Sequence, residues 1–160
     1  MPDEFFFLTF GGLGVSLAGF AGLIHALDRS DTADNPETKW RIRNIVMGGF
    51  TVAIAGLLTW PVFRFTEDVD TTVRIVSAYF VVGLVRQFAV DARPGPAWPN
   101  DTRRKVFLGI GVALSVVAVL NLFVASVALL ELLFFLAIGG PIGTFIRAIG
   151  DLHDPHEASA

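Results

Sequence analysis

Residues Phe5–Leu27 read FFFLTFGGLGVSLAGFAGLIHAL, and this stretch decides the fold class. Its 23 residues carry no charge and one titratable side chain, His25. A helix rises ~1.5 Å per residue, so this stretch would cross the ~30 Å hydrocarbon core of a bilayer. A secretory signal is excluded because Asp3 and Glu4 precede the stretch where basic residues would be needed, and because the apolar core is too long. We interpret the stretch as a membrane-spanning helix.

Small side chains gather on one side of this expected helix. Helices associate in lipid through close backbone approach, which small residues permit, so this side is the expected contact face. It comprises Gly11, Gly14, Ala18, Gly22 and His25. The opposite arc is bulky and should face lipid. It comprises Phe6, Phe10, Leu13, Leu17, Phe20 and Ile24. The contact face would pack against another helix of the chain or, alternatively, form a seam between copies.

The composition of the whole chain is that of a membrane protein. Of its 160 residues, 53% are hydrophobic and 17% are charged, against ~25% charged in soluble proteins. This length allows one domain, which we assign to residues 1–150, followed by a polar tail at 151–160. The net charge of −3 gives no reason to expect a nucleic-acid partner. The absence of cysteine excludes disulfides and cysteine metal sites.

Four further apolar stretches predict an all-α, helical integral membrane bundle of about five transmembrane helices. They cover residues 44–63, 73–90, 106–124 and 127–149. Four spans plus an interfacial or re-entrant segment is the alternative. The third span is the least hydrophobic of the five. Residues 106–149 would reach about 66 Å as one helix at ~1.5 Å per residue, so the chain must turn back. The turn is expected at Asn121–Ser126 or near Glu131.

The second span carries both packing and termination signals. Gly49 and Ala53 have the spacing of a small-residue packing face. Trp60 and Pro61 are interpreted as an interfacial anchor and a helix terminator, followed by an acidic loop at 64–72. The last span contains Gly139, Gly140 and Pro141. We expect a proline kink there, and the alternative is a broken helix of the transporter kind that lines an ion site.

Basic residues predict the orientation in the membrane. The loops after the first and third spans hold eight of them, whereas the loop after the second span holds only Arg64. The eight are Arg29, Lys39, Arg41, Arg43, Arg93, Arg103, Arg104 and Lys105. Lysine and arginine are retained on the cytoplasmic side, so these loops should be cytoplasmic. We therefore expect a multi-pass protein of the cell membrane, with the N-terminus outside and the C-terminus in the cytoplasm.

Polar side chains inside the spans are the candidate functional groups, because each is costly in lipid. Glu131 would be interfacial if the chain turns there; otherwise it would pair with Arg74 or form a proton or cation site. Arg86 and His25 lie near the cytoplasmic ends of their spans, where side chains reach the interface or meet anions and lipid headgroups. Asn121 is expected to hydrogen-bond between helices, as is Gln87.

The first half of the chain resembles a widespread group of small, uncharacterised prokaryotic multi-span membrane proteins. The segment SLAGFAG at 16–22, and Trp40 with Arg41-Ile42-Arg43 before the second span, carry the resemblance. The Trp60-Pro61 ending is similar too. The resemblance implies a compact multi-span membrane protein with no catalytic residues and no known activity.

No motif points to an enzyme. The sequence has no zinc-protease helix, no nucleophile elbow and no phosphate-binding loop, and we expect no cofactor and no metal. The favoured function is a non-catalytic membrane protein that associates with itself or with a membrane partner. The alternative is a small oligomeric ion channel or transporter that uses Glu131 and the break at Gly139–Pro141. Besides the lipid bilayer, the expected partner is thus a second copy or another membrane protein.

Overall fold

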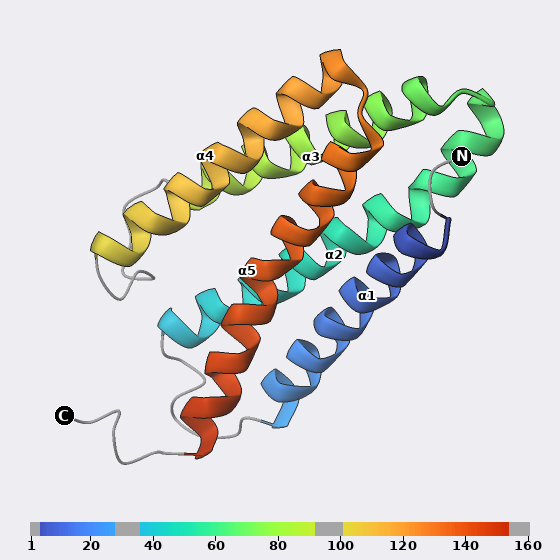
Figure 1. The fold of residues 1–160 in the computed structure, drawn as a ribbon. Helices are drawn as coiled ribbons and strands as arrows, with labels where there is room; N and C mark the ends of the chain where they lie inside the picture. Colours follow the sequence, from blue (N-terminus) through green and yellow to red (C-terminus); the bar gives the residue numbers. More distant parts are fainter. Residues whose placement is uncertain (1–3, 28–35, 92–100, 154–160) are drawn as a thin grey trace.

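The computed structural model describes residues 4–27, 36–91 and 101–153, and every regular element among them is an α-helix. The all-α class is therefore confirmed. On length and composition, four of these helices can span a membrane: α1, α2, α4 and α5. Of the five expected spans, α3 is the one that does not reach this apolarity. The helices are α1 (Glu4–Leu27), α2 (Pro36–Thr66), α3 (Val69–Asp91), α4 (Asp101–Val124) and α5 (Val127–His153) (Figure 1).

The helices form two antiparallel pairs with α5 between them. α1 packs along α2, α3 packs along α4, and α5 contacts both pairs (Figure 1). The pairs converge where α2 turns into α3 and α4 turns into α5, and they diverge toward the opposite end (Figure 1). The bundle is thus wedge-shaped: the helix pairs meet at one end, the closed end, and are spread apart at the other, the diverging end.

α2 is longer than the expected second span. It continues through Pro61 to Thr66, so the interpretation of Pro61 as a terminator is wrong. Proline removes one backbone donor, and the hydrogen bonds on either side of it carry the helix onward. Trp60 does lie near the helix end, with the Phe63 ring centroid 5.9 Å away and the Arg64 guanidinium 5.8 Å from the centre of its ring.

The α2–α3 turn is closed by hydrogen bonds around Asp68. Glu67 has a left-handed φ of 52°, and its N–H donates to the Phe63 carbonyl over 2.8 Å. The Asp68 carboxylate caps α3 by accepting from the Thr71 hydroxyl at 2.5 Å and from the Thr71 N–H at 2.9 Å. These bonds favour the charged form and hold the pKa of Asp68 below its ordinary value. The loop expected at 64–72 is therefore mostly helical.

The α4–α5 turn lies at Ala125 and Ser126, the first of the two candidate positions. Ala125 has a left-handed φ of 53°. The fully buried Asn121 side chain accepts from the Ser126 N–H at 2.8 Å and donates to the Ser77 hydroxyl at 3.0 Å. One amide therefore fixes the turn and fastens it to α3, which is the interhelical role expected of it. Glu131 is already one turn inside α5.

The α1–α2 interface is built on glycine. A Cβ added to Gly14 would lie 2.8 Å from the backbone nitrogen of Ala53, and one added to Gly49 would lie 2.7 Å from the carbonyl oxygen of Gly14. No real Cβ tolerates backbone atoms this close, so the two helices are in direct backbone contact. Gly11 and Ala18 are buried on the same side of α1. The expected contact face thus packs, in large part, within the chain.

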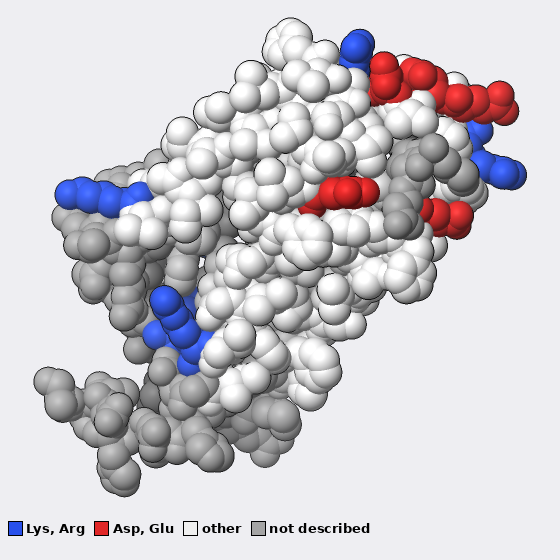
Figure 2. All heavy atoms as spheres, viewed as in Figure 1, with Lys and Arg blue, Asp and Glu red and all other residues white. Residues whose placement is uncertain are grey.

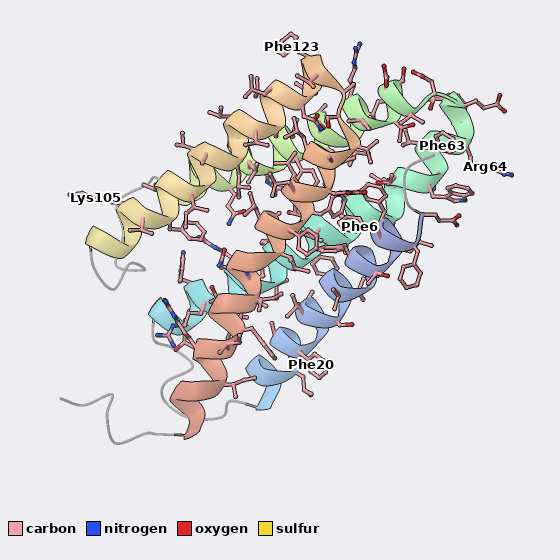
Figure 3. The ribbon with its side chains drawn as sticks, viewed as in Figure 1. Phe6, Phe20, Phe63, Arg64, Lys105 and Phe123 are labelled. Atoms are coloured by element: carbon pink, nitrogen blue, oxygen red, sulfur yellow. The ribbon has the colours of Figure 1, made fainter. Side chains whose placement is uncertain are left out.

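The bulky arc of α1 does not all face outward. Phe10 is only 7% exposed, with the Phe134 and Phe135 ring centroids 6.0 and 4.8 Å away. Phe6 is half-buried between α1 and α5 (Figure 3). The expectation that this arc faces lipid is wrong here, because α5 provides α1 with a second packing partner. Phe20, further along the arc, is 56% exposed.

Charged side chains gather at the two ends of the bundle. The closed end carries Arg64, and the diverging end carries Lys105 (Figure 3). Between the ends, the face in Figure 2 is broad and largely uncharged. We call the closed end the acidic end, after Glu4, Glu67, Asp68 and Asp70. We call the diverging end the basic end, after Lys39, Arg43, Arg86, Lys105 and Arg147.

Candidate functional site: a central cavity

A cavity of about 420 Å³ lies where the helix pairs diverge. We call it the central cavity, and it is enclosed by α2, α3, α4 and α5. Figure 2 shows a hollow in the surface between the α4 side and the α5 side of the molecule. Ile110 of α4 and Leu136 of α5 line the cavity and are 55% and 47% exposed, so they mark a lateral opening between these two helices. Sites for small molecules are commonly ~300–1,000 Å³.

Small residues create this space. A Cβ added to Gly139 or Gly140 of α5 would meet no atom within 4 Å, so both glycines border empty volume. Pro141 is buried beside them and fits against Gly48 of α2, where a Cβ would overlap the proline ring. The alternative of a broken helix is wrong, because α5 is helical throughout Val127–His153 with Pro141 inside it. Gly139, Gly140 and Pro141 line the cavity instead of interrupting the helix.

A polar bridge crosses the cavity wall near the basic end. The Asn44 side chain of α2 is 5% exposed, and its amide donates to the Thr144 hydroxyl of α5 over 3.1 Å. The Gln87 amide of α3 donates to the Asn44 side-chain oxygen, also over 3.1 Å. This amide bridge joins three helices. Among the described residues, no donor bonds the Gln87 side-chain oxygen, so it is available to a ligand.

The remaining walls of the cavity are apolar. Leu114, Phe80 and Ala137 are typical of them, and none of the lining residues in the described part of the chain is charged. Toward the acidic end the cavity is closed by Phe80, which meets Phe134 edge-on at a centroid distance of 5.1 Å. Both rings are fully buried. Toward the basic end, the Phe107 ring contacts Trp40 edge-on at 5.6 Å.

The structure separates most of the sequence-predicted polar residues. Glu131 is half-buried on α5, and Arg74 is exposed at the start of α3. Within the described residues, no ion pair or hydrogen bond joins Glu131 to Arg74, and neither lines the central cavity. Arg86 is exposed and lines a different groove. Gly22 is exposed, with no atom within 4 Å of an added Cβ. The His25 side chain lies outside the described part of the chain.

Asn44 is a site residue that the sequence alone did not predict. Asn44 was expected only to begin the second span, and Gln87 only to bond between helices. A signal was present, because each amide directly follows an arginine near the basic end of its helix: Arg43-Asn44 and Arg86-Gln87. The shared level of the two amides depends on the register of α2 against α3, which one helix sequence does not reveal.

Comparison with known proteins identifies no relative. No family model, curated protein or solved structure matches the chain. The resemblance noted for the first half of the chain thus finds no matching family, and the function has to be argued from the geometry.

Proposed function

We propose that the chain is an integral membrane protein of the cell membrane in which all five helices cross the bilayer. The four apolar helices support insertion. α3 runs along α4, and its polar Thr72 and Ser77 are fully buried, away from lipid. The positive-inside rule makes the basic end cytoplasmic, with the N-terminus outside and the C-terminus inside.

We further propose that the protein acts by binding, without catalysis, and that its membrane partner is a lipid-soluble molecule held in the central cavity. The observation that carries this is a largely apolar cavity whose described lining residues carry no charge, with a Gln87 side-chain oxygen that accepts no hydrogen bond from the described residues. Such a site fits a molecule with an apolar body and one uncharged donor group. A charged ligand would be left without a counter-charge in a low-dielectric site, which is costly.

A photolabelling experiment tests this site. The probe is a long-chain alcohol that carries a diazirine, added to the protein in nanodiscs. Leu114 lines the cavity and is only 7% exposed, so bulk lipid does not reach it. We expect adducts at Leu114 in the wild type. Gly140→Leu should fill the cavity and reduce these adducts about 10-fold, since Gly140 borders empty space.

Gly143→Leu is the matched control. Gly143 is on the same helix, is exposed, and also has no atom within 4 Å of an added Cβ, but it does not line the cavity. Its adducts at Leu114 should equal those of the wild type. The proposal fails if the wild type is not labelled at Leu114, or if both variants are labelled equally well in folded protein.

The second candidate function is the oligomeric ion channel or transporter. It is favoured by Glu131, whose half-buried carboxyl lies in an apolar helix with no ion pair among the described residues. It is opposed by the uncharged lining of the central cavity and by the packed pair Phe80 and Phe134 between that cavity and the acidic end. Self-association, in turn, would need a surface other than Gly14 and Ala18, because α2 covers both.

A further inference from the structure

A second cavity lies on the other side of the amide bridge. It has a volume of about 440 Å³ and is formed by α2 and α3 alone. We call it the lateral groove. It shares Asn44, Thr51 and Gln87 with the central cavity, so these residues form the wall between the two. Its other lining residues are Trp40, Arg43, Met47, Phe50, Ile54, Tyr79, Val82, Gly83 and Arg86.

Two arginines line this groove at nearly the same depth in the bundle. The 3.1 Å hydrogen bond between Asn44 and Gln87 fixes the register of α2 against α3. Because α2 and α3 are antiparallel (Figure 1), the preceding residues lie on opposite sides of this bond, Arg43 toward the basic end and Arg86 toward the acidic end, so the two differ in level by only about 3 Å at ~1.5 Å per residue. Both are exposed and both line the groove. An anion placed between them would meet positive charge from both helices.

The groove becomes apolar directly beyond the arginines. Met47, Phe50 and Val82 line it and are 43%, 48% and 68% exposed. From Arg43 to Ile54 the groove follows α2 for eleven residues, or about 16 Å at ~1.5 Å per residue. Trp40 lies one turn on the other side of Arg43, where an aromatic ring suits the membrane interface.

We propose that the lateral groove binds an anionic phospholipid of the cytoplasmic leaflet, with its phosphate between Arg43 and Arg86 and one acyl chain along the apolar groove. Along the groove, an aromatic ring at the interface is followed by two cations and then by apolar surface. A phospholipid presents its phosphate and its acyl chains in the same order from the interface inward. Basic pockets between helices on the cytoplasmic side suit such headgroups. The inference requires membrane insertion, but not a ligand in the central cavity.

Native mass spectrometry of the protein, released from micelles with phosphatidylglycerol or phosphatidylcholine, tests the inference. We expect tighter binding of phosphatidylglycerol. Arg86→Gln and Arg43→Gln should each weaken it about 5-fold, as expected for ~1 kcal/mol per arginine, with less change for phosphatidylcholine. Lys105→Gln and Arg147→Gln remove exposed charges at the same end but outside the groove, and should have no comparable effect.

A second pair of variants tests the apolar part of the groove. Ile54→Trp should obstruct the acyl chain and weaken phosphatidylglycerol binding, whereas Leu58→Trp should not. Leu58 is on the same helix, is similarly exposed and lies outside the groove: the exposed fractions are 42% for Ile54 and 41% for Leu58.

Several results would overturn the inference. Equal binding of the two lipids would remove the role of the arginines. Displacement of the lipid by glycerol phosphate, which has a headgroup but no chains, would mean that the site takes a soluble phosphate. Unchanged binding in folded Ile54→Trp would mean that no chain lies in the groove. Gly140→Leu should leave this binding intact, so failure here is distinguishable from failure of the central-cavity proposal.

Discussion

At the α2–α3 turn, one side chain stabilises the start of a helix. Asp68 accepts two hydrogen bonds from Thr71, and these favour its carboxylate form. Because the pKa in the folded protein lies below the ordinary value of 3.8, the charged cap stabilises the fold at and above that pH. The stabilisation is lost as the pH falls through the lowered pKa.

A substitution measures this residue-scale effect. Asp68→Asn keeps an acceptor oxygen but removes the charge, so it should lower the melting temperature modestly at pH 7. The difference from the wild type should shrink as the pH falls below about 3.8. Thermal unfolding in detergent, followed by circular dichroism from pH 7 to pH 2.5, checks this. Asp70→Asn, at an exposed neighbour in the first turn of α3, is the control. A difference that grows in acid would contradict the assignment.

For single residues, the sequence predicted that a polar side chain within a span bonds between helices, but not which partner it bonds. Asn121 was expected to bond between helices, and it does so through Ser77. Asn44 was missed because its partners, Thr144 and Gln87, come from α5 and α3. Sequence separation of this kind gives no periodic signal, so a bridge between three helices emerges only when their register is known.

At the scale of the element, the glycine face of α1 has a measurable role. Gly14→Ala would put a methyl group against backbone atoms of α2, which are not free to move aside. We expect the free energy of unfolding to fall by about 2 kcal/mol, as for other overpacked interfaces. Gly12→Ala is the control, because it is the same substitution on the same helix but no atom lies within 4 Å of the added Cβ. It should be neutral or slightly stabilising, since alanine favours helix.

Denaturation in detergent, monitored by circular dichroism, compares the two variants. Equal stability of Gly14→Ala and Gly12→Ala would contradict the backbone contact between α1 and α2. The measurement also bears on self-association, because a seam between copies would make the effect of Gly14→Ala depend on protein concentration, whereas intrachain packing would not.

The helices themselves were largely predictable. Their ends were not, nor were the faces by which they pack against a second neighbouring helix. Small-residue spacing predicts a packing face, because close approach of two backbones requires it. The division of α1 into a contact face and a lipid-facing arc was wrong at Phe10, because a helix in a bundle has more than one neighbour. Pro61 was misinterpreted because proline removes only one bond from a helix that is otherwise intact. The cavity depends on the divergence of helices, which no single span encodes.

At the scale of the whole molecule, the separation of charge predicts the orientation that we propose. A reporter fused after residue 160 should read out as cytoplasmic, and one inserted between Glu67 and Asp68, in the turn at the acidic end, should read out as external. Alkaline phosphatase, active outside, and green fluorescent protein, fluorescent inside, give opposite readouts for each position. An external signal at residue 160 would contradict both the orientation and the cytoplasmic location of the lateral groove.

The hydrogen bonds at the closed acidic end place a geometric pivot for α4 there. There the Asn121–Ser77 hydrogen bond joins α4 to α3 and the Thr66–Thr72 hydrogen bond joins α2 to α3, whereas near the basic end the amide bridge joins α2, α3 and α5 and does not include α4. A rotation of about 5° at the pivot moves a helix end ~30 Å away, twenty residues along, by about 2.6 Å. Such a rotation of α4 would widen the lateral opening between α4 and α5 by about the same distance. Ligands of different width could then enter the same cavity.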